Sequence, residues 1–383
     1  MRIVDVRERT LPISRYADPA IPSGGLTTSI VAVVTDTVRN GRPVVGYGFA
    51  SVGRFGQGGL IRERFAPRLL AATALEDGDG GLDPRRAWSA MMQGEKPGGH
   101  GERCVAVGTL DMAVWDAAAK IAGLPLSHYL AQRLGRTAPP PRVRVYAGGG
   151  YRYPADDLAR LSEEIRQIAA LGFTHGKIKI GGDSLDDDLR RIGAAASQLG
   201  GASYLAVDAM NSYGPDAALQ AARALTPLGL WWFEDICDPL DFPTQARAAS
   251  IYPGPIAAGE ALFSRAEARL LDDYAGLRRD QDILLFDPVH CYGLTHYCEM
   301  VAELASRGWP LGAFWPHGGH LFGLHVVAGL GLGGAEVNPF AFAPFRGWAS
   351  GTTLADGSLE VPQVPGIGFE LHDEAWRAFG SLG

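Results

Sequence analysis

The chain has 383 residues, which is too long for a single ordinary hydrophobic core. The sequence therefore predicts two domains, or a barrel with an additional domain. Hydrophobic residues make up 46% and charged residues 20%, which is normal for a globular protein. The net charge of −7 provides no attraction for nucleic acid or for an anionic membrane surface, and neither is expected as a partner.

The beginning of the sequence and its cysteines favour a cytoplasmic protein. The segment MRIVDVRERT is charged from its second residue and lacks the apolar core of a signal peptide. The most apolar stretch, LFGLHVVAGLGLGGA, contains His325 and several glycines, so no membrane span is expected. The four cysteines, at positions 104, 237, 291 and 298, show neither a CxxC motif nor a zinc spacing, and reduced thiols are expected.

Residues 1–135 predict an α+β domain. Two strand-like runs, SIVAVVTDTV and RPVVGYGFA, flank Asn40 and Gly41, a dipeptide typical of a type I′ hairpin turn. A long helix near 102–121 combines an apolar stripe with several small residues, which indicates close packing. Two shorter helices are expected before it, near 61–74 and 84–92.

The middle of the chain predicts a different architecture. After a proline cluster at 139–141, which we interpret as a linker, strand-like and helix-like segments alternate over residues 143–345. This alternation is typical of a parallel α/β fold. Residues 346–383 lose the alternation, and VPQVPGIGFE predicts an extended segment that returns to the first domain.

Six residues with acid, base or metal-binding side chains end successive apolar runs of the α/β region, between 26 and 30 residues apart. Catalytic groups of a (β/α)₈ barrel sit at the carboxyl ends of its strands, so this spacing predicts one shared barrel mouth. The six residues are Lys179, Asp208, Glu234, Glu260, Asp287 and His317.

Three consecutive members of this series are carboxylates: Asp208, Glu234 and Glu260. One such group alone is often a helix cap or an ion-pair partner. Three of them at one barrel mouth repel each other unless a cation lies between them. Because ligation by oxygen alone favours Mg²⁺ over zinc or copper, the sequence predicts a Mg²⁺ site, with Mn²⁺ as a substitute.

The lysine pair Lys177 and Lys179 has the two-residue spacing that places both side chains on one face of a strand. If that face is the barrel interior, each ammonium group lowers the pKa of the other. A lysine with a pKa of roughly 7–8 is a workable general base at neutral pH. The alternative is a solvent-facing strand end with two ordinary lysines.

Asp287 and His317 lie at the ends of neighbouring predicted strands. The carboxylate can accept a hydrogen bond from one ring nitrogen and raise the basicity of the other, although a single histidine is more often structural. His320 offers only a weak case for a metal-binding pair, because the carboxylates already account for a metal. The segment GLGLGG at 329–334 fits GxGxxG but follows a predicted helix, so we expect a tight connection and no nucleotide site.

The order of these residues resembles the enolase superfamily, and within it the mandelate racemase subgroup. The motifs RFGQGGLIRERFA, GEKPGGHGER, GTLDMAVWDA, PHGGH and PGIGFE are similar to those of D-tartrate dehydratases over nearly the whole chain. The resemblance implies an α/β fold, a modified TIM barrel of the (β/α)₇β type. It also implies an α+β capping domain formed from both termini, and a homo-oligomer.

The resemblance also implies roles for the barrel residues. Asp208, Glu234 and Glu260 would bind Mg²⁺. Lys179 would abstract the proton alpha to a substrate carboxylate, and His317, oriented by Asp287, would protonate the departing β-hydroxyl. The expected reaction is dehydration of a hydroxy diacid or acid sugar, similar to D-tartrate, to a 2-keto acid. Enzymes of this superfamily are a known case of a Lys or His base that acts with one or two Mg²⁺ ions.

Three further residues are expected to contact the small carboxylate substrate. Lys177 would hydrogen-bond the carboxylate next to the reacting carbon. Lys96, in the GEKPGGHGER loop of the capping domain, would reach a second carboxylate. Glu336, on a possible last barrel strand, could face the substrate.

The sequence departs from the resembled pattern at four positions where relatives have polar residues. They are Ala50, Val52, Met210 and Ala261. Each change removes a polar contact near the expected pocket, and lost hydrogen bonds change which substrate a site accepts. The segment 15–25 also differs in length and composition from that of the resembled proteins.

Three alternative functions stay open. They are a racemase or epimerase of a 2-hydroxy acid with the same Lys/His pair, a non-catalytic barrel, and an unrelated metal-dependent barrel enzyme such as an aldolase.

Overall fold

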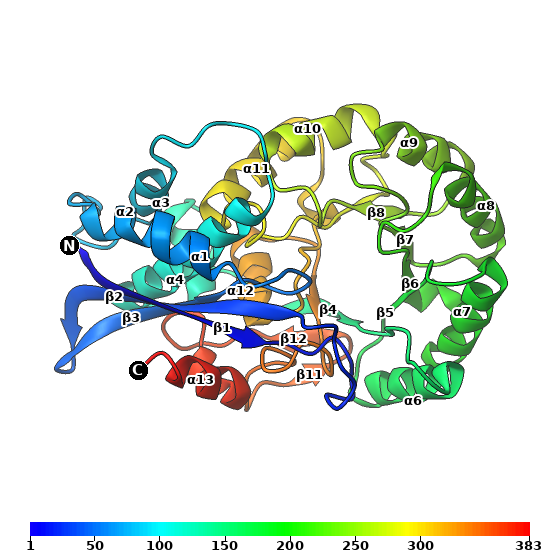
Figure 1. Ribbon diagram of the computed structural model, residues 1–383, viewed down its shortest axis with the longest axis horizontal. Helices are drawn as coiled ribbons and strands as arrows, with labels where there is room; N and C mark the ends of the chain where they lie inside the picture. The colour runs from blue at the N-terminus through cyan, green and yellow to red at the C-terminus, as the bar shows by residue number, and fades with distance from the viewer.

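The computed structural model describes residues 1–383 and consists of a cap and a barrel. In Figure 1 the cap, with the N-terminal strands in blue, lies beside a ring of strands and helices. The α/β fold class and the capped barrel expected from the sequence are confirmed. No helix has the length and apolar character needed to cross a membrane.

The cap is built on an antiparallel sheet of three strands in the order β1-β2-β3. The turn between the second and third strands is the predicted one, because Asn40 and Gly41 have φ of 50° and 74°, as a type I′ turn requires. The first strand was not predicted from the sequence. The strands are β1 (Ile3–Pro12), β2 (Thr27–Arg39) and β3 (Arg42–Phe49).

Helices follow the sheet in the cap. The expected helix near 61–74 is instead continuous from Gly58 to Ala71 and contains a π-helical turn. The expected helices near 84–92 and 102–121 are confirmed, and one further helix was missed. The elements are α1 (Gly58–Leu60), η1 (Ile61–Phe65), α2 (Ala66–Ala71), α3 (Pro84–Met92), α4 (Glu102–Ala122) and α5 (Leu126–Arg133).

Helix α4 joins the cap to the barrel. It is buried on nearly all sides, more than its apolar stripe indicated, because it packs on β3 with one face and on the barrel with another. Small residues make this possible: a methyl group on Gly108 would overlap the carbonyl oxygen of Val289, and one on Gly46 would overlap that of Ala113. The close packing predicted from the small residues of this helix is confirmed.

The barrel contains seven strand–helix units and a closing strand, which confirms the (β/α)₇β prediction. Parallel pairing runs from β4 to β9, a bridge joins Leu284 to Phe314, and β10 closes the ring on β4. Its strands are β4 (Arg142–Gly148), β5 (Gly176–Lys179), β6 (Leu205–Asp208), β7 (Trp232–Glu234), β8 (Ile256–Ala258), β9 (Ile283–Leu284) and β10 (Ala335–Val337).

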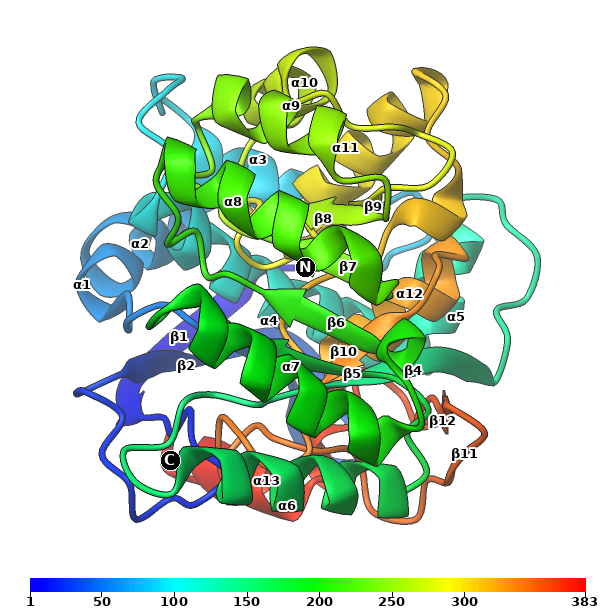
Figure 2. The same ribbon diagram turned by 90° about the vertical axis from the view of Figure 1, so that its right-hand side faces the viewer.

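Seven helices surround these strands, and α7 and α8 cover the side that faces the viewer in Figure 2. The GLGLGG segment is the tight helix-to-strand connection that we predicted, since it joins α12 to β10. The helices are α6 (Asp157–Ala170), α7 (Leu185–Leu199), α8 (Pro215–Leu225), α9 (Phe242–Ile251), α10 (Arg265–Tyr274), α11 (Leu294–Ser306) and α12 (Leu321–Leu330). Short 3₁₀ turns are η2 (Ala202–Tyr204), η3 (Thr226–Leu228) and η4 (Leu311–Ala313).

Aromatic side chains fill the interior of the barrel beneath the site. Tyr146, Trp232 and Trp315 form a buried cluster, with ring centroids 5.0 to 6.0 Å apart. The Nζ atom of Lys177 lies 5.6 Å from the centroid of the Tyr146 ring. The cluster therefore forms the floor on which the polar groups of the barrel mouth rest.

The C-terminal segment returns to the cap. It first adds a short strand antiparallel to β4, and α13 then packs near the sheet, where Trp376 and Phe379 contact the ring of Tyr47. The elements of this segment are β11 (Leu354–Ala355), β12 (Ser358–Glu360), η5 (Phe369–Leu371) and α13 (Asp373–Gly380). The cap thus contains residues from both ends of the chain.

A buried carboxylate at the junction of cap and barrel predicts a pH dependence of stability. Asp111 of α4 accepts hydrogen bonds from the backbone nitrogen of Thr295 (3.0 Å) and from its hydroxyl (2.8 Å). Burial nevertheless raises the pKa of Asp111 to about 7. Between about pH 4 and pH 7 the folded protein keeps a proton that the unfolded chain releases, so this group lowers the free energy of unfolding as the pH rises.

We expect Asp111→Asn to remove this dependence. Relative to the wild type, the variant should gain about 4 kcal/mol of unfolding free energy between pH 4 and pH 8. Urea denaturation of both proteins across this range measures the difference. If the difference in unfolding free energy between the two proteins stays constant with pH, Asp111 is ionised in the folded protein across this range.

Candidate active site

The three predicted metal-binding carboxylates meet at the barrel mouth. Asp208 ends β6, Glu234 ends β7 and Glu260 follows β8, so neighbouring parallel strands deliver all three to one edge. One oxygen from each lies within 4.8 Å of the other two. Asp208 and Glu234 are fully buried, while the side chain of Glu260 is 20% exposed.

These carboxylates fit a divalent cation. Burial raises the pKa of Glu234, and the negative charges of Asp208 and Glu260 raise it further. Lys177 lowers this pKa but does not outweigh them, and the resulting value is about 8. Oxygen Oε2 of Glu260 is buried without a hydrogen-bond partner. A hard cation would satisfy both features, and an all-oxygen set suits Mg²⁺.

Both lysines of β5 point into the barrel interior. Lys177 forms a hydrogen bond with Glu234 and lies 3.4 Å from Glu336, while Lys179 forms one with Asp208. Burial lowers the pKa of Lys179, but the Asp208 carboxylate outweighs burial, so the pKa is raised. The pKa of Lys177 is also raised, because the Glu234 and Glu336 carboxylates outweigh the lowering effect of burial.

The expectation that the two lysines have lowered pKa values is therefore wrong for the protein without a bound cation. It considered only the repulsion between the two ammonium groups, which is weaker than their attraction to the carboxylates. The interior location predicted for both side chains is confirmed, since their exposed fractions are 1% and 12%.

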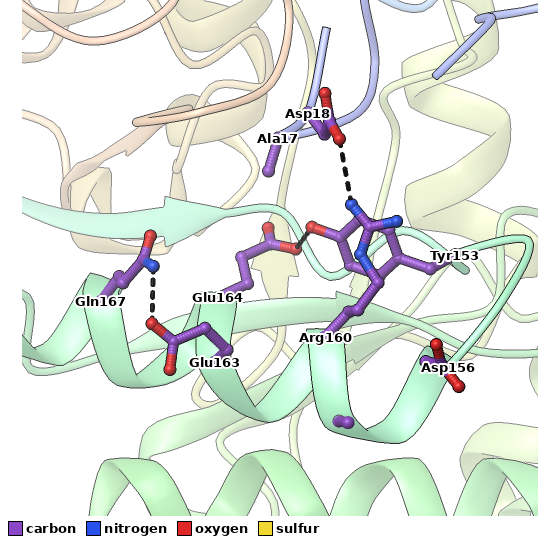
Figure 3. A pocket seen from close by; sticks show the side chains of 9 residues that line it. Ala17, Asp18, Tyr153, Asp156, Arg160, Glu163, Glu164 and Gln167 are labelled. Atoms are coloured by element: carbon purple, nitrogen blue, oxygen red, sulfur yellow. Dashed lines mark hydrogen bonds and ion pairs between the residues drawn. The ribbon is translucent and has the colours of Figure 1, made fainter. Parts of the chain in front are cut away.

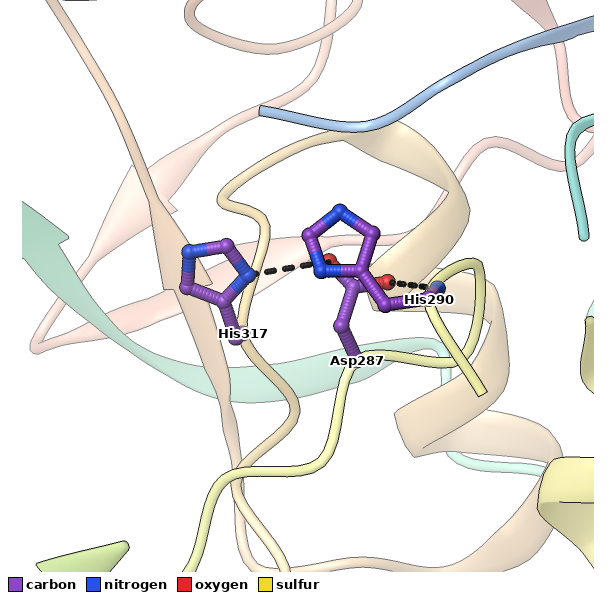
Figure 4. A group of neighbouring side chains, drawn as sticks. All are labelled: Asp287, His290 and His317. Atoms are coloured by element: carbon purple, nitrogen blue, oxygen red, sulfur yellow. Dashed lines mark hydrogen bonds and ion pairs between the residues drawn. The ribbon is translucent and has the colours of Figure 1, made fainter. Parts of the chain in front are cut away.

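Asp287 and His317 form the expected hydrogen bond. Nitrogen Nδ1 of His317 donates to Oδ2 of Asp287 at 2.9 Å, and its Nε2 lies 3.5 Å from Oε2 of Glu260. Burial lowers the pKa of His317, but Glu260 and Asp287 outweigh burial and raise it to about 9. The ring is thus held as an acid next to the carboxylate cluster. Figure 4 shows Asp287 between His317 and a second histidine, His290.

A serine of the cap, which sequence reasoning missed, completes this arrangement. The hydroxyl of Ser51 donates to Oδ2 of Asp287 (2.7 Å) and lies 3.0 Å from Nε2 of His320. Ser51 has φ of 61°, a left-handed conformation that is unusual for serine and typical of functional loops. His320, which we considered as a metal ligand, is instead the neighbour of this serine.

We expect Ser51→Ala to reduce turnover about 10–100-fold, as is usual when a group that orients an active residue is lost. Oδ2 of Asp287 would keep the hydrogen bond from His317 but lose the one from Ser51, so the ring orientation would loosen. Steady-state kinetics measures the effect, with Ser89→Ala as the matched control, because the Ser89 hydroxyl bonds only within its own helix. Equal activity of both variants would contradict the role.

Glu336 lies in the site, whereas Lys96 makes no contact with it. Glu336 is on β10 as proposed, is buried, and accepts a hydrogen bond from the backbone nitrogen of Gly318 at 3.2 Å. Lys96 is exposed on the loop between α3 and α4, where only its carbonyl oxygen is bonded, by Arg103. A role for Lys96 requires movement of that loop.

Tyr151 is a second residue that sequence reasoning missed. Its ring lies 5.2 Å from Nζ of Lys179, and Arg15 of the cap lies on the same ring at 5.9 Å. Burial raises the pKa of the Tyr151 phenol. The available signal was its position three residues after β4, at the same barrel mouth as the other strand ends.

Comparison with known proteins agrees with this geometry. The family model described as "Enolase C-terminal domain-like" matches residues 160–375, which include both lysines, the three carboxylates and the Asp287–His317 pair. The chain belongs to the enolase superfamily.

Individual superfamily members are similar over most of their length. Arabinonate dehydratase of Saccharolobus solfataricus is 29% identical over 74% of each chain. L-talarate/galactarate dehydratase of Salmonella typhimurium is 26% identical over 91% of this chain and 82% of its own. The crystal structure of L-talarate dehydratase from Polaromonas sp. JS666, complexed with Mg and L-glucarate, is similar with a TM-score of 0.73 and 25% identity. The match covers 96% of this chain and 94% of that one.

Three of the four positions at which the sequence departs from the resembled pattern differ in their surroundings. Ala50 and Val52 are buried, and Val52 packs in an apolar cluster with Leu26 and Phe342. Met210 is 44% exposed, and the amide of Asn211 donates to Asp235 at 3.1 Å. The amide next to the metal cluster is thus engaged by a neighbouring carboxylate.

A groove of about 520 Å³ lies away from the carboxylate cluster, between the cap segment 15–25 and α6 (Figure 3). Arg160 forms an ion pair with Asp18 at 3.3 Å, and Tyr153 donates to the buried Glu164 at 2.7 Å. Neither the carboxylate cluster nor the Asp287–His317 pair lines this groove. The Arg160–Asp18 ion pair connects α6 to the cap segment at this groove.

Proposed function

We propose that this enolase superfamily protein is a Mg²⁺-dependent dehydratase of hydroxy diacids or acid sugars, with D-tartrate as a candidate substrate. The observation that carries the proposal is the convergence of Lys179, the three carboxylates and the Asp287–His317 pair at one barrel mouth. The named dehydratases among its relatives, and the Mg- and L-glucarate-bound neighbour, support the same reaction class.

Asp208, Glu234 and Glu260 would hold Mg²⁺, which supplies positive charge for the substrate carboxylate as negative charge builds on it. Lys179 would take the proton alpha to that carboxylate as a neutral amine, a form that requires a cation on Asp208 to offset the charge that raises the lysine pKa. Lys177 would donate a hydrogen bond to the same carboxylate. The electron pair of the broken C–H bond then expels the β-hydroxyl group.

His317 completes the reaction as the acid. Held by Asp287, it gives the Nε2 proton to the departing hydroxyl, which leaves as water. The enol that remains tautomerises to a 2-keto acid. A racemase or epimerase is the second candidate, because the same two groups can remove a proton and return it without loss of the hydroxyl.

A keto-acid assay with Mg²⁺ across mono- and diacid sugars, including all tartrates, tests the proposal. We expect formation of a 2-keto acid from at least one acid, abolished in Lys179→Ala and His317→Asn. An inverted centre without keto acid would identify the epimerase. If no acid is turned over and no alpha hydrogen exchanges in D₂O, the catalytic assignment is wrong.

A further inference from the structure

His290 is a buried histidine without a hydrogen-bond partner. It lies on the loop after β9, its side chain is 2% exposed, and neither ring nitrogen has a partner within hydrogen-bond distance. A buried imidazole left in this state is costly, because both of its polar atoms have lost their interactions with water. The proposed reaction does not require this residue.

The ring of His290 is directed toward Asp287, and His317 lies on the other side of that carboxylate. Its Nδ1 lies 3.6 Å from Oδ2 of Asp287, which is 2.9 Å from Nδ1 of His317 (Figure 4). One donor atom from each of the three residues lies within 4.8 Å of the other two. The backbone nitrogen of His290 also donates to Asp287 at 3.3 Å, which fixes the loop on this carboxylate.

These separations suit a small transition-metal ion. Zinc binds imidazole nitrogen and carboxylate oxygen at about 2.0–2.2 Å in a tetrahedron, so its ligands lie roughly 3.3 Å from each other. The two oxygen–nitrogen separations, 2.9 and 3.6 Å, lie on either side of that spacing. Two imidazoles and one carboxylate favour Zn²⁺ over Mg²⁺, which prefers oxygen ligands alone.

We propose that Asp287, His290 and His317 form a second metal site that takes Zn²⁺ and thereby switches off His317. The site is distinct from the carboxylate cluster, because Nδ1 of His317 faces Asp287 whereas Nε2 faces Glu260. The side chain of His317 is 11% exposed, whereas Asp287 and His290 are buried, so an ion would enter past His317.

Occupation of the site changes what His317 can do. As an acid, His317 releases the Nε2 proton and keeps the Nδ1 proton, which it shares with Asp287. Zn²⁺ can bind Nδ1 only when the Nδ1 proton leaves to solvent, and the ring then keeps its single proton on Nε2. With Zn²⁺ on Nδ1, release of that Nε2 proton would leave an anionic imidazolate instead of a neutral ring. The ion therefore blocks proton delivery without touching Lys179 or the Mg²⁺ ligands.

Zinc binding to the intact chain tests the site directly. Equilibrium dialysis in excess Mg²⁺ should find one tightly held Zn²⁺ per chain in the wild type. His290→Leu should weaken binding by about 100-fold or more, since loss even of a group behind a ligand costs 10–100-fold. Co²⁺ under the same conditions should give intense tetrahedral absorption bands in the wild type alone.

The matched control is His175→Leu, which removes a half-buried histidine that contacts Tyr204 and Trp231, away from the site. Circular dichroism and thermal unfolding of each variant, with a second replacement, His290→Asn, separate loss of a ligand from loss of the fold. Equal zinc affinity in the wild type and His290→Leu overturns the proposal. So does a wild type in which Mg²⁺ displaces all zinc.

A kinetic arm connects the site to the reaction. One equivalent of Zn²⁺ in excess Mg²⁺ should silence wild-type turnover and leave His290→Leu active. The binding measurements need no substrate, so they decide the existence of the site even if the proposed dehydration is wrong. Tight binding that leaves wild-type turnover intact would overturn the switch.

Discussion

Lys179→Ala is expected to remove both keto-acid formation and exchange of the alpha hydrogen with D₂O. The variant loses the amine that forms a hydrogen bond with Asp208 in the carboxylate cluster and that would act as the base. General base catalysis contributes about 10²–10⁴-fold, so turnover should fall by at least that factor. Proton NMR of the substrate in D₂O and the keto-acid assay measure the two steps separately.

His317→Asn is the informative partner of this variant. It removes the acid but leaves Lys179 and the carboxylates in place, so alpha-hydrogen exchange should persist while keto-acid formation falls. Circular dichroism checks the fold of both proteins. If His317→Asn loses exchange and Lys179→Ala retains it, the assignments of base and acid must be interchanged.

Two replacements within the metal cluster should weaken Mg²⁺ binding equally and differ in stability. Asp208→Asn removes the partner of Lys179 and a charge 3.8 Å from Lys177. Breaking a buried ion pair costs about 3–5 kcal/mol, so the Mg²⁺-free variant should unfold that much more easily. Glu260→Gln removes only the longer, 3.5 Å ion pair with His317, from a carboxylate that is 20% exposed and whose Oε2 has no hydrogen bond, and should cost less.

Thermal and urea unfolding with and without Mg²⁺ measure the contrast. At 100 times its dissociation constant, Mg²⁺ should stabilise the wild type by about 2.7 kcal/mol and neither variant. The lysine–carboxylate contacts also set a pH dependence for the Mg²⁺-free wild type. Burial raises the pKa of Asp208, but Lys179 and Lys177 outweigh burial and lower it, so its stabilising contribution is lost as the pH falls below the usual aspartate range. Equal stability of the two variants would contradict the ion-pair argument.

The barrel could be predicted from the sequence because its signals are local and repeated. Each strand is a short apolar run, each ends on a polar side chain, and the interval between ends is nearly constant. Parallel strands of one sheet place such ends at one edge, so a spacing in the sequence becomes a proximity in space. Asp208 and Glu234 meet in the structure for this reason.

Features that depend on contacts between distant segments were not predicted. Ser51 reaches Asp287 across 236 positions, and no spacing in the sequence connects them. The pKa of Lys179 depends on the carboxylates of other strands, so reasoning from β5 alone gave the wrong direction. The π-helical turn at Ile61–Phe65 lies within a helical pattern that does not distinguish it from an α-helix.

The return of the last helix to the cap has a consequence for how the protein is made. Phe49 at the end of β3 stacks on Phe345 at 4.0 Å, and Tyr47 contacts Phe379 of α13. A ribosome adding about 5–20 residues per second needs roughly 17–66 s to travel from Phe49 to Phe379. During that interval the aromatic face of the first sheet lacks its cover and is open to association with other nascent chains. The loop that carries Ser51 follows β3 directly, so this serine is synthesised 236 residues before the Asp287 to which it donates.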